Sequence, residues 1–263
     1  MTSKAMEDLI GAWRGVPPEG PYVLPADQRA LAEYQRLTVR HNSFAAYCAD
    51  PCFGLDDGRL HIGLIPQPYV GNLREADVFL LMANPGLGPL DYFAEEYSSE
   101  YRNTQFQDLH QRDVSGFSSL NPKESWHGGG QYWQGRFRDL ALGLCESTDC
   151  SFKDAFEVLA RRVACLQLVP YHSTRFGIPM KLRESLKSVQ LMKGFVHQDL
   201  RPRASNGEIL IIVLRRVDEW GLGSEESESI LTYPRNLRRG AFISRKSPGY
   251  QKILAFLRAS RPA

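Results

Sequence analysis

The chain has no long apolar run. No segment approaches the ~18 consecutive apolar residues that a membrane-spanning helix requires, so a membrane is not expected among its partners. Its first residues, MTSKAMEDLIGAWRG, include acidic residues early and lack the apolar centre of a secretory signal. We therefore expect a cytoplasmic protein.

Cysteine is scarce, and its number is odd: there are five among 263 residues. An odd count without a secretory signal favours reduced thiols. The pairs Cys48/Cys52 and Cys145/Cys150 offer four ligands for a zinc ion or an iron–sulfur cluster. Their spacings, C-x3-C and C-x4-C, are wider than the C-x2-C usual at such sites. Structural thiols are the preferred interpretation, and we predict neither a metal nor a cofactor.

Acidic residues are absent from the C-terminal part of the chain. The last one is Glu228, and from Tyr233 onward every charged side chain is basic: Arg235, Arg238, Arg239, Arg245, Lys246, Lys252, Arg258 and Arg261. Such one-sided charge is typical of a segment that meets a polyanion. A solvated basic helix at the C-terminus gives the same pattern and remains the alternative.

The remaining composition is that of a globular protein. Apolar residues make up 43% and charged residues 24%, which excludes disorder as the default interpretation. The chain is long enough to bury a sizeable core. We predict a single domain over residues 1–263, with residues 1–58 as an N-terminal helical extension. Within that extension, residues 26–49 show the apolar spacing of a helix.

Three continuous apolar runs predict buried strands: residues 77–83, 163–169 and 208–214. Strands covered on both faces are apolar throughout rather than alternating. Helical patterns lie between and after them, at residues 132–146, 151–164, 180–200 and 247–260. Strands that alternate with helices predict an α/β sandwich around a mainly parallel sheet.

Polar and turn-forming residues follow each of these strands. The first strand is followed by NPGLGPLDY, the second by PYHSTRF, and the third by RRVDEWGL and then YPRNLRRGAFIS. Ligands of open α/β sheets bind beyond the carboxyl ends of the strands. Asn84 offers a donor and an acceptor there, and Gly86 and Gly88 allow a ligand to approach the backbone closely. An ordinary turn would have the same sequence.

The order of these segments resembles the uracil-DNA glycosylase superfamily. MANPG matches the Gly-x-Asn-Pro-Gly motif of its mismatch-specific, thymine-directed and single-strand-selective branches, with Met82 in place of the first Gly. The resemblance implies a three-layer α/β/α sandwich with a four-stranded sheet. It also implies that Asn84 holds the attacking water and that Ala83, Pro85 and Gly86 bind the substrate. Gly86 stands where the uracil-specific branch has Tyr, which implies a roomier pocket.

The second region of the resemblance is CLQLVPYHS, where the family has a base-reading side chain at the end of a strand. The family's Asn is not obvious here, so we expect Gln167, Tyr171, His172 or Ser173 to replace it. His172 is also a candidate catalytic group, and a hydrogen-bonded structural His is the alternative. An aromatic side chain, Tyr92 or Phe93, is expected to stack on the flipped base.

The third region is YPRNLRRG, which matches the position of the family's His-Pro-Ser-Pro loop. That loop enters the DNA minor groove and helps to expel the base. Pro234 is retained, and Tyr233 replaces His. The resemblance predicts DNA contacts from Tyr233, Pro234, Arg235, Asn236, Arg238 and Arg239, the arginines neutralising phosphates.

Two further features have two interpretations each. Asp91 either caps the helix that follows or orients the water as a second carboxylate. The stretch SWHGGGQYW, Ser125 to Trp133, is either a flexible loop that brings His127 near the ligand or a plain linker. It lacks the Lys and Ser/Thr of a P-loop, which argues against nucleotide hydrolysis.

These observations predict a monomeric DNA glycosylase that hydrolyses the N-glycosidic bond of a damaged, mismatched or modified base. Such an enzyme must rotate the nucleotide out of the stack and stabilise charge on the leaving base. One alternative is a non-catalytic module on the same fold that binds DNA or nucleobases. The other is a hydrolase of small N-glycosides, which the acid-free C-terminal segment disfavours because such an enzyme needs no basic surface.

Overall fold

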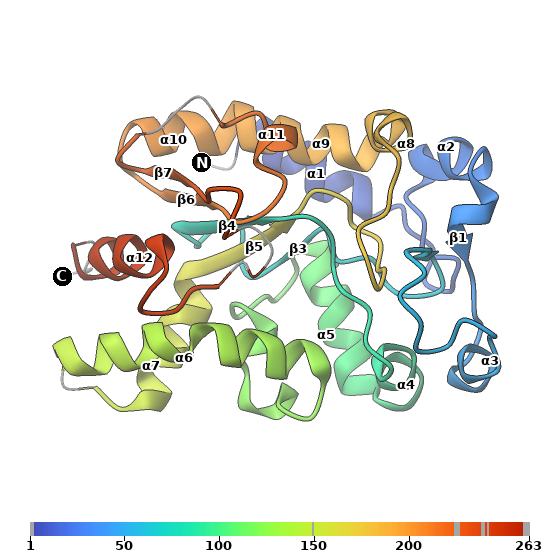
Figure 1. Ribbon diagram of the computed structural model, residues 1–263, viewed down its shortest axis with the longest axis horizontal. Coiled ribbons are helices and arrows are strands. Elements are labelled where there is room, and N and C mark those ends of the chain that lie inside the picture. The colour runs from blue at the N-terminus through green and yellow to red at the C-terminus, as the bar shows by residue number, and fades with distance from the viewer. Residues whose placement is uncertain (1–2, 149, 224–226, 238–239, 241, 260–263) are drawn as a thin grey trace. The chain divides into compact units, whose positions relative to one another are not determined.

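A computed structural model describes residues 3–148, 150–223, 227–237, 240 and 242–259 (Figure 1). The chain divides into two compact units. Unit 1 comprises Met1–Tyr69, Ala83–Asp113 and Gln167–Asp199, and unit 2 comprises Val70–Met82, Val114–Leu166 and Leu200–Ala263. Each unit is described by itself. The prediction of one domain with a helical extension stays a prediction.

The main sheet has five strands in the order β3-β5-β4-β6-β7. Its strands are β3 (Tyr69–Val70), β4 (Val78–Met82), β5 (Val163–Gln167), β6 (Leu210–Val213) and β7 (Ile230–Thr232). β4 pairs with β6, and β6 with β7, both in parallel. The prediction of four strands is therefore wrong. The shortest strands, β3 and β7, have two and three residues, too few to leave a clear periodic pattern in the sequence.

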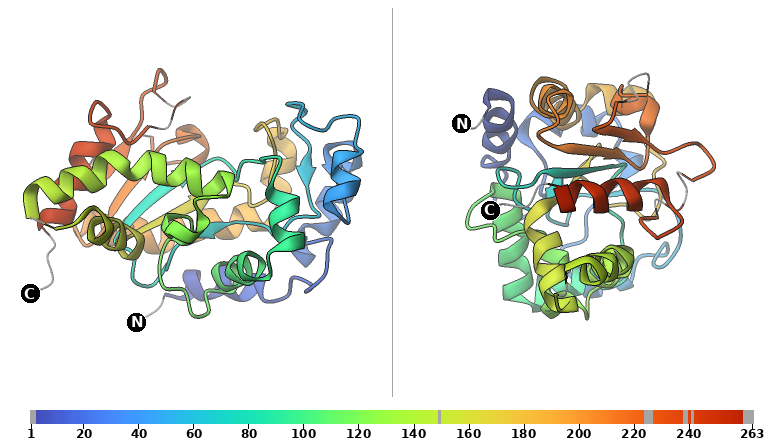
Figure 2. Two further views of the ribbon diagram at one scale, coloured as in Figure 1. Left: turned by 90° about the horizontal axis from the view of Figure 1, so that it is seen from below. Right: turned by 90° about the vertical axis from the view of Figure 1, so that its left-hand side faces the viewer.

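The three strands predicted from apolar runs are confirmed as β4, β5 and β6. Every residue of these strands is buried, which explains why their sequences are apolar throughout. In unit 2, helices lie on both sides of the strands, with α10 and α11 on one side and α12, α6 and α7 on the other (Figures 1 and 2). The chain is thus a mixed α/β protein with a mostly parallel central sheet.

Three helices of unit 2 match the helical patterns predicted at residues 132–146, 151–164 and 247–260, and two short helices were not predicted. They are α6 (Gly128–Thr148), α7 (Phe152–Arg162), α10 (Arg201–Ser205), α11 (Val217–Trp220) and α12 (Pro248–Ala259), with 3-10 turns at Ser118–Leu120 and Pro122–Glu124. The side chains of Ser151 and Asp154 form a capping box that fixes the start of α7. The helical pattern at 151–164 thus corresponds to α7, which begins after the Ser151 cap and ends at Arg162.

The Gly triplet of SWHGGGQYW is the first turn of α6 rather than a flexible loop. A Cβ atom added at Gly130 would lie 1.9 Å from the carbonyl oxygen of Glu124, so only glycine fits there. His127 is buried, and its Nδ1 accepts a hydrogen bond from the Gly129 N–H at 3.1 Å. Close backbone packing explains this stretch, and the expectation of a flexible loop was wrong.

Unit 1 consists mainly of short helices. They are α1 (Lys4–Trp13), α2 (Gln28–Ala32), α3 (Phe44–Cys48), α4 (Asp91–Tyr97), α5 (Ser99–His110), α8 (Met180–Ser185) and α9 (Lys187–Phe195), with 3-10 turns at Pro25–Asp27 and Gln35–Leu37 and a π-helical turn at Val196–Leu200. A small parallel pair joins β1 (Thr38–Val39) to β2 (Leu60–His61). Among the described residues, no helix is long and apolar enough to cross a membrane.

The helix expected over residues 26–49 is broken into several pieces. The β-branched residues Thr38 and Val39 form β1, where such side chains are favoured. Ser43 then caps a new helix, because its hydroxyl accepts a hydrogen bond from the Ala46 N–H at 3.1 Å. The strand pairing and the cap outweigh the apolar periodicity of the whole stretch.

Candidate functional site

The segments that leave β4 and β5 meet in unit 1. The Val169 N–H donates to the Ala83 carbonyl at 2.9 Å, and the Ser173 N–H donates to the Pro85 carbonyl at 3.3 Å. The two strands are neighbours in the sheet. The structure thus brings together two exits that the sequence marked independently as polar and rich in turn formers.

Asn84 is held by its amide nitrogen. Nδ2 donates to Ser173 Oγ at 2.8 Å and to the Pro85 carbonyl at 2.9 Å, and lies 3.4 Å from the Tyr171 carbonyl. Carbonyl oxygens only accept, so the nitrogen must be the atom that faces them. Oδ1 consequently points away from these partners. Among the described residues nothing donates to it, and the side chain is only half-buried.

Ser173 fixes the orientation of the Asn84 amide. Its side chain is buried, and its hydroxyl donates to the Arg175 carbonyl at 2.9 Å. Because the hydroxyl proton is used in that bond, a lone pair faces Asn84 and accepts from Nδ2. Ser173 therefore positions Asn84, whereas the sequence had placed it as a base reader.

His172 bridges two carbonyl groups. Nδ1 lies 2.8 Å from the Gly86 carbonyl and Nε2 lies 3.1 Å from the Ile65 carbonyl. The ring is buried, and the His172 carbonyl accepts a hydrogen bond from the His61 N–H at 2.9 Å. Carbonyl oxygens only accept, so a neutral imidazole donates to one of the two, and both ring nitrogens face the backbone. The geometry favours a role in holding the Asn84–Gly88 loop over direct catalysis.

Two carboxylates of α4 contact the backbone around this loop. Asp91 accepts a hydrogen bond from the Gly88 N–H, and Glu95 accepts from the Ile65 N–H at 2.9 and 3.2 Å. Asp91 thus ties α4 to the loop before it, but it does not cap the helix, since Leu90 is the N-cap residue and the described structure shows no side-chain cap hydrogen bond there. Glu95 lies one turn further along the same face of the helix.

Glu95 is the ionisable residue that sequence reasoning missed. Burial raises its pKa to about 8, and the negative charge of Asp91 acts in the same direction, against the Ile65 hydrogen bond and Arg102. Through the Ile65 peptide and the His172 ring, Glu95 is connected to the carbonyl of Gly86. The four-residue spacing of Asp91 and Glu95 was the signal available in the sequence.

The two candidate stacking residues lie in different environments. Tyr92 is buried, its ring centroid lies 4.7 Å from that of Tyr47, and burial raises its pKa. Phe93 is 38% exposed, with Phe44 and Tyr97 at ring centroid distances of 5.4 and 4.8 Å. Phe93 is therefore the one of the two that can meet a ligand.

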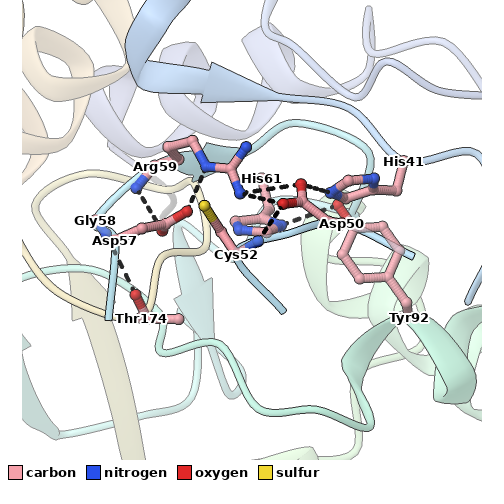
Figure 3. Close-up of polar contacts among 9 residues, drawn as sticks. All are labelled: His41, Asp50, Cys52, Asp57, Gly58, Arg59, His61, Tyr92 and Thr174. Atoms are coloured by element: carbon pink, nitrogen blue, oxygen red, sulfur yellow. Dashed lines mark hydrogen bonds and ion pairs between the residues drawn. The ribbon is translucent and has the colours of Figure 1, made fainter. Parts of the chain in front are cut away.

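Tyr92 lies at one end of a cluster of charged and aromatic groups (Figure 3). The Tyr92 hydroxyl lies 3.2 Å from His61 Nδ1, and burial lowers the pKa of His61 to about 4, so this imidazole is neutral near pH 7. His41 Nε2 lies 3.1 Å from Asp50 Oδ2. The hydrogen bond from the Cys52 N–H lowers the pKa of Asp50 despite its burial, and Arg59 adds to the effect.

Arg59 joins this cluster to the exit of β5. It pairs with Asp50 at 3.0 Å and with Asp57. The neighbouring Gly58 N–H donates to Thr174 Oγ1 at 3.3 Å (Figure 3). The members come from segments scattered along the sequence, and no spacing motif connects them. Sequence reasoning had no signal for this cluster.

Tyr171, one of the proposed base readers, points elsewhere, and Gln167, another, is the last residue of β5. The Tyr171 hydroxyl donates to Asp27 Oδ2 at 2.7 Å and accepts from the Leu24 N–H at 3.3 Å. Burial, together with the charge of Asp27, raises the pKa of Tyr171. Gln167 is buried at the end of β5, where its N–H donates to the Pro68 carbonyl at 2.8 Å. Tyr171 reaches Asn84 only through its carbonyl oxygen.

The predicted DNA-contacting residues belong to unit 2. Tyr233 is buried, and its hydroxyl donates to the Phe242 carbonyl at 2.7 Å and accepts from the Gly249 N–H at 3.2 Å. The next three residues are exposed in a turn that the Leu237 N–H closes onto the Pro234 carbonyl at 2.9 Å: Pro234, Arg235 and Asn236. The other two predicted contacts, Arg238 and Arg239, lie outside the described residues.

The described thiols, imidazoles and carboxylates do not form a metal site. All five cysteines are free, and within the described ranges no three His, Cys, Asp or Glu side chains gather closely enough to hold a metal ion. Comparison of the chain with protein-family models, with curated proteins and with solved structures gives no match. The site thus offers two features for chemistry: a fixed amide at the end of β4 and the exposed ring of Phe93 on α4.

Proposed function

We propose that this chain is a DNA N-glycosylase of the kind found in the uracil-DNA glycosylase superfamily, acting on a damaged, mismatched or modified base. The observation that supports this most directly is the fixed orientation of Asn84. Three acceptors hold Nδ2, so Oδ1 is presented at the exit of β4 as an acceptor without a partner among the described residues. A water that donates to Oδ1 turns a lone pair away from the protein.

That geometry suits attack on a sugar carbon. Glycosidic bonds break through an oxocarbenium-like state, so the nucleophile needs placement more than strong activation. A neutral amide orients water without adding negative charge beside the departing base. Phe93 offers an exposed ring on which a flipped base stacks. In the proposed three-layer α/β/α fold, this is the edge of the sheet where ligands bind.

The space beside Gly86 supports acceptance of substituted bases. Gly86 is exposed, and a Cβ atom added there would meet no atom within 4 Å. Its φ angle is not among the positive values, so neither backbone strain nor packing demands glycine at this position. The open space agrees with the roomier pocket that the resemblance implies. We propose that the base carries a bulky group at C5.

The test is excision from end-labelled oligonucleotides that each carry one test base. The panel contains uracil, hypoxanthine, 5-hydroxymethyluracil and larger C5-modified pyrimidines, and abasic sites are revealed by alkaline cleavage. The wild type and Asn42→Ala, an exposed amide of the same unit, are expected to leave abasic sites; Asn84→Ala is not. Salt-dependent DNA binding without excision of any base would contradict this proposal and support the non-catalytic module.

A further inference from the structure

Arg136, on α6 of unit 2, lies between two aromatic rings. Its guanidinium carbon is 4.6 Å from the ring centroid of Tyr132, one turn earlier on the helix, and 4.2 Å from that of Phe242. Guanidinium groups are weakly hydrated and stack well on aromatic rings. The guanidinium is therefore held between two aromatic side chains.

The guanidinium N–H groups of Arg136 have no hydrogen-bond acceptor among the described residues. Within the part of the chain that the structure describes, Arg136 donates no hydrogen bond and pairs with no carboxylate, and its Nη1 is buried without an acceptor. The acidic side chains nearest to Arg136 along α6 contact Arg245 instead. Asp139 accepts from the Arg245 N–H at 2.9 Å, and Glu146 pairs with the Arg245 side chain. Among the described residues, Arg136 thus has no acceptor for its N–H groups and no ion-pair partner.

The ring of Phe242 is placed over Arg136 by specific contacts. The buried Tyr233 hydroxyl binds the Phe242 carbonyl at 2.7 Å. A Cβ atom added at Gly240 would lie 2.2 Å from the Phe242 ring, so glycine is required where the ring crosses the backbone. Burial raises the pKa of Tyr233, and the positive charge of Arg136 acts in the opposite direction.

We propose that Arg136 binds a phosphodiester group of nucleic acid. The rings of Tyr132 and Phe242 hold the guanidinium in place for this contact. A planar guanidinium matches two phosphate oxygens, and such bidentate pairs are the strong ones. The segment from Tyr233 onward has no acidic residue, and Arg235 is exposed on it, which favours a polyanion over an isolated carboxylate ligand. The inference rests on the DNA binding of the proposed function but not on base excision.

The experiment is the salt dependence of binding to a fluorescent oligonucleotide, measured by anisotropy between about 50 and 200 mM salt, where each phosphate contact contributes ~0.9 to the slope of log K against log salt. Arg136→Gln is expected to reduce that slope by about 0.9, because one phosphate contact is lost. The matched control is Arg138→Gln, an exposed arginine of the same helix with the same change in charge. It is expected to leave most of the slope intact.

Arg136→Lys keeps the positive charge but removes the planar guanidinium group and its paired donors. It is expected to weaken binding while keeping most of the slope, and circular dichroism checks that each variant is folded. Equal slopes for Arg136→Gln and Arg138→Gln would overturn the inference, as would wild-type protein that binds no DNA. If excision is absent but the Arg136 slope change is found, the inference stands and the proposed enzyme activity falls.

Discussion

Replacing Glu95 by Gln tests the electrostatics of the site through protein stability. Glu95 ordinarily titrates near 4.5, and burial raises its pKa to about 8 in the folded chain. The folded protein therefore retains a proton that the unfolded chain releases. The free energy of unfolding must fall as the pH rises from 4.5 to about 8, and then level off.

The size of the effect follows from the same two values. At 1.36 kcal/mol per pH unit, the span from 4.5 to about 8 corresponds to a loss of about 5 kcal/mol. Relaxation of the structure and entry of water around the carboxylate reduce this, so about 5 kcal/mol is an upper bound. Glu95→Gln keeps an oxygen that accepts the Ile65 N–H but cannot ionise, so this loss is absent from the variant.

The assay is urea unfolding of both proteins at about pH 5, 7 and 9, the range over which the linked proton is lost. The variant is expected to gain stability relative to the wild type as the pH rises. Burial also raises the pKa of Asp27 and lowers that of His61, but both residues are present in both proteins and cancel in the difference. Parallel stability curves across this range would show that Glu95 does not retain a proton in the folded protein at neutral pH.

Three further substitutions have definite expected outcomes. Gly130→Ala should destabilise the fold by more than ~1 kcal/mol, since its Cβ would lie 1.9 Å from the Glu124 carbonyl; thermal unfolding measures this, and an unchanged melting temperature would contradict the packing. Tyr171→Phe should cost about 1–3 kcal/mol in urea unfolding, because buried Asp27 loses a donor; a change below experimental error would show that this bond is not needed. Gly86→Tyr should fold normally, because the space is open, and should lower excision of bulky C5-modified bases more than of uracil; an equal loss for both would argue against a pocket at this position.

The parts of the structure that sequence reasoning found are those with strong local signals. β4, β5 and β6 are continuous apolar runs, and parallel strands carry their exits to one edge of the sheet. Asn84 was identified because Asn-Pro-Gly follows such a run directly. Its amide does meet the residues after β5, as expected for neighbouring strands.

The parts that sequence reasoning missed depend on contacts between distant segments. Asp50 meets His41 and Arg59 only once the chain is folded, so no spacing in the sequence reveals the cluster. The sequence predicted that Ser173 and His172 lie near Asn84, and they do. Both side chains are buried and contact the Asn84–Gly88 loop, so they stabilise that loop. A polar residue at a strand exit looks the same in sequence whether it faces a ligand or the backbone.

The central claim is that Asn84 Oδ1 positions a water for attack on an N-glycosidic bond. The most direct measurement is the single-turnover excision rate of Asn84→Ala and of the control Asn42→Ala, using the best base of the panel. We expect Asn42→Ala to match the wild type and Asn84→Ala to be slower by at least ~100-fold, the order of effect for a group that positions the reacting water. A rate for folded Asn84→Ala within a few-fold of the wild type would contradict the account.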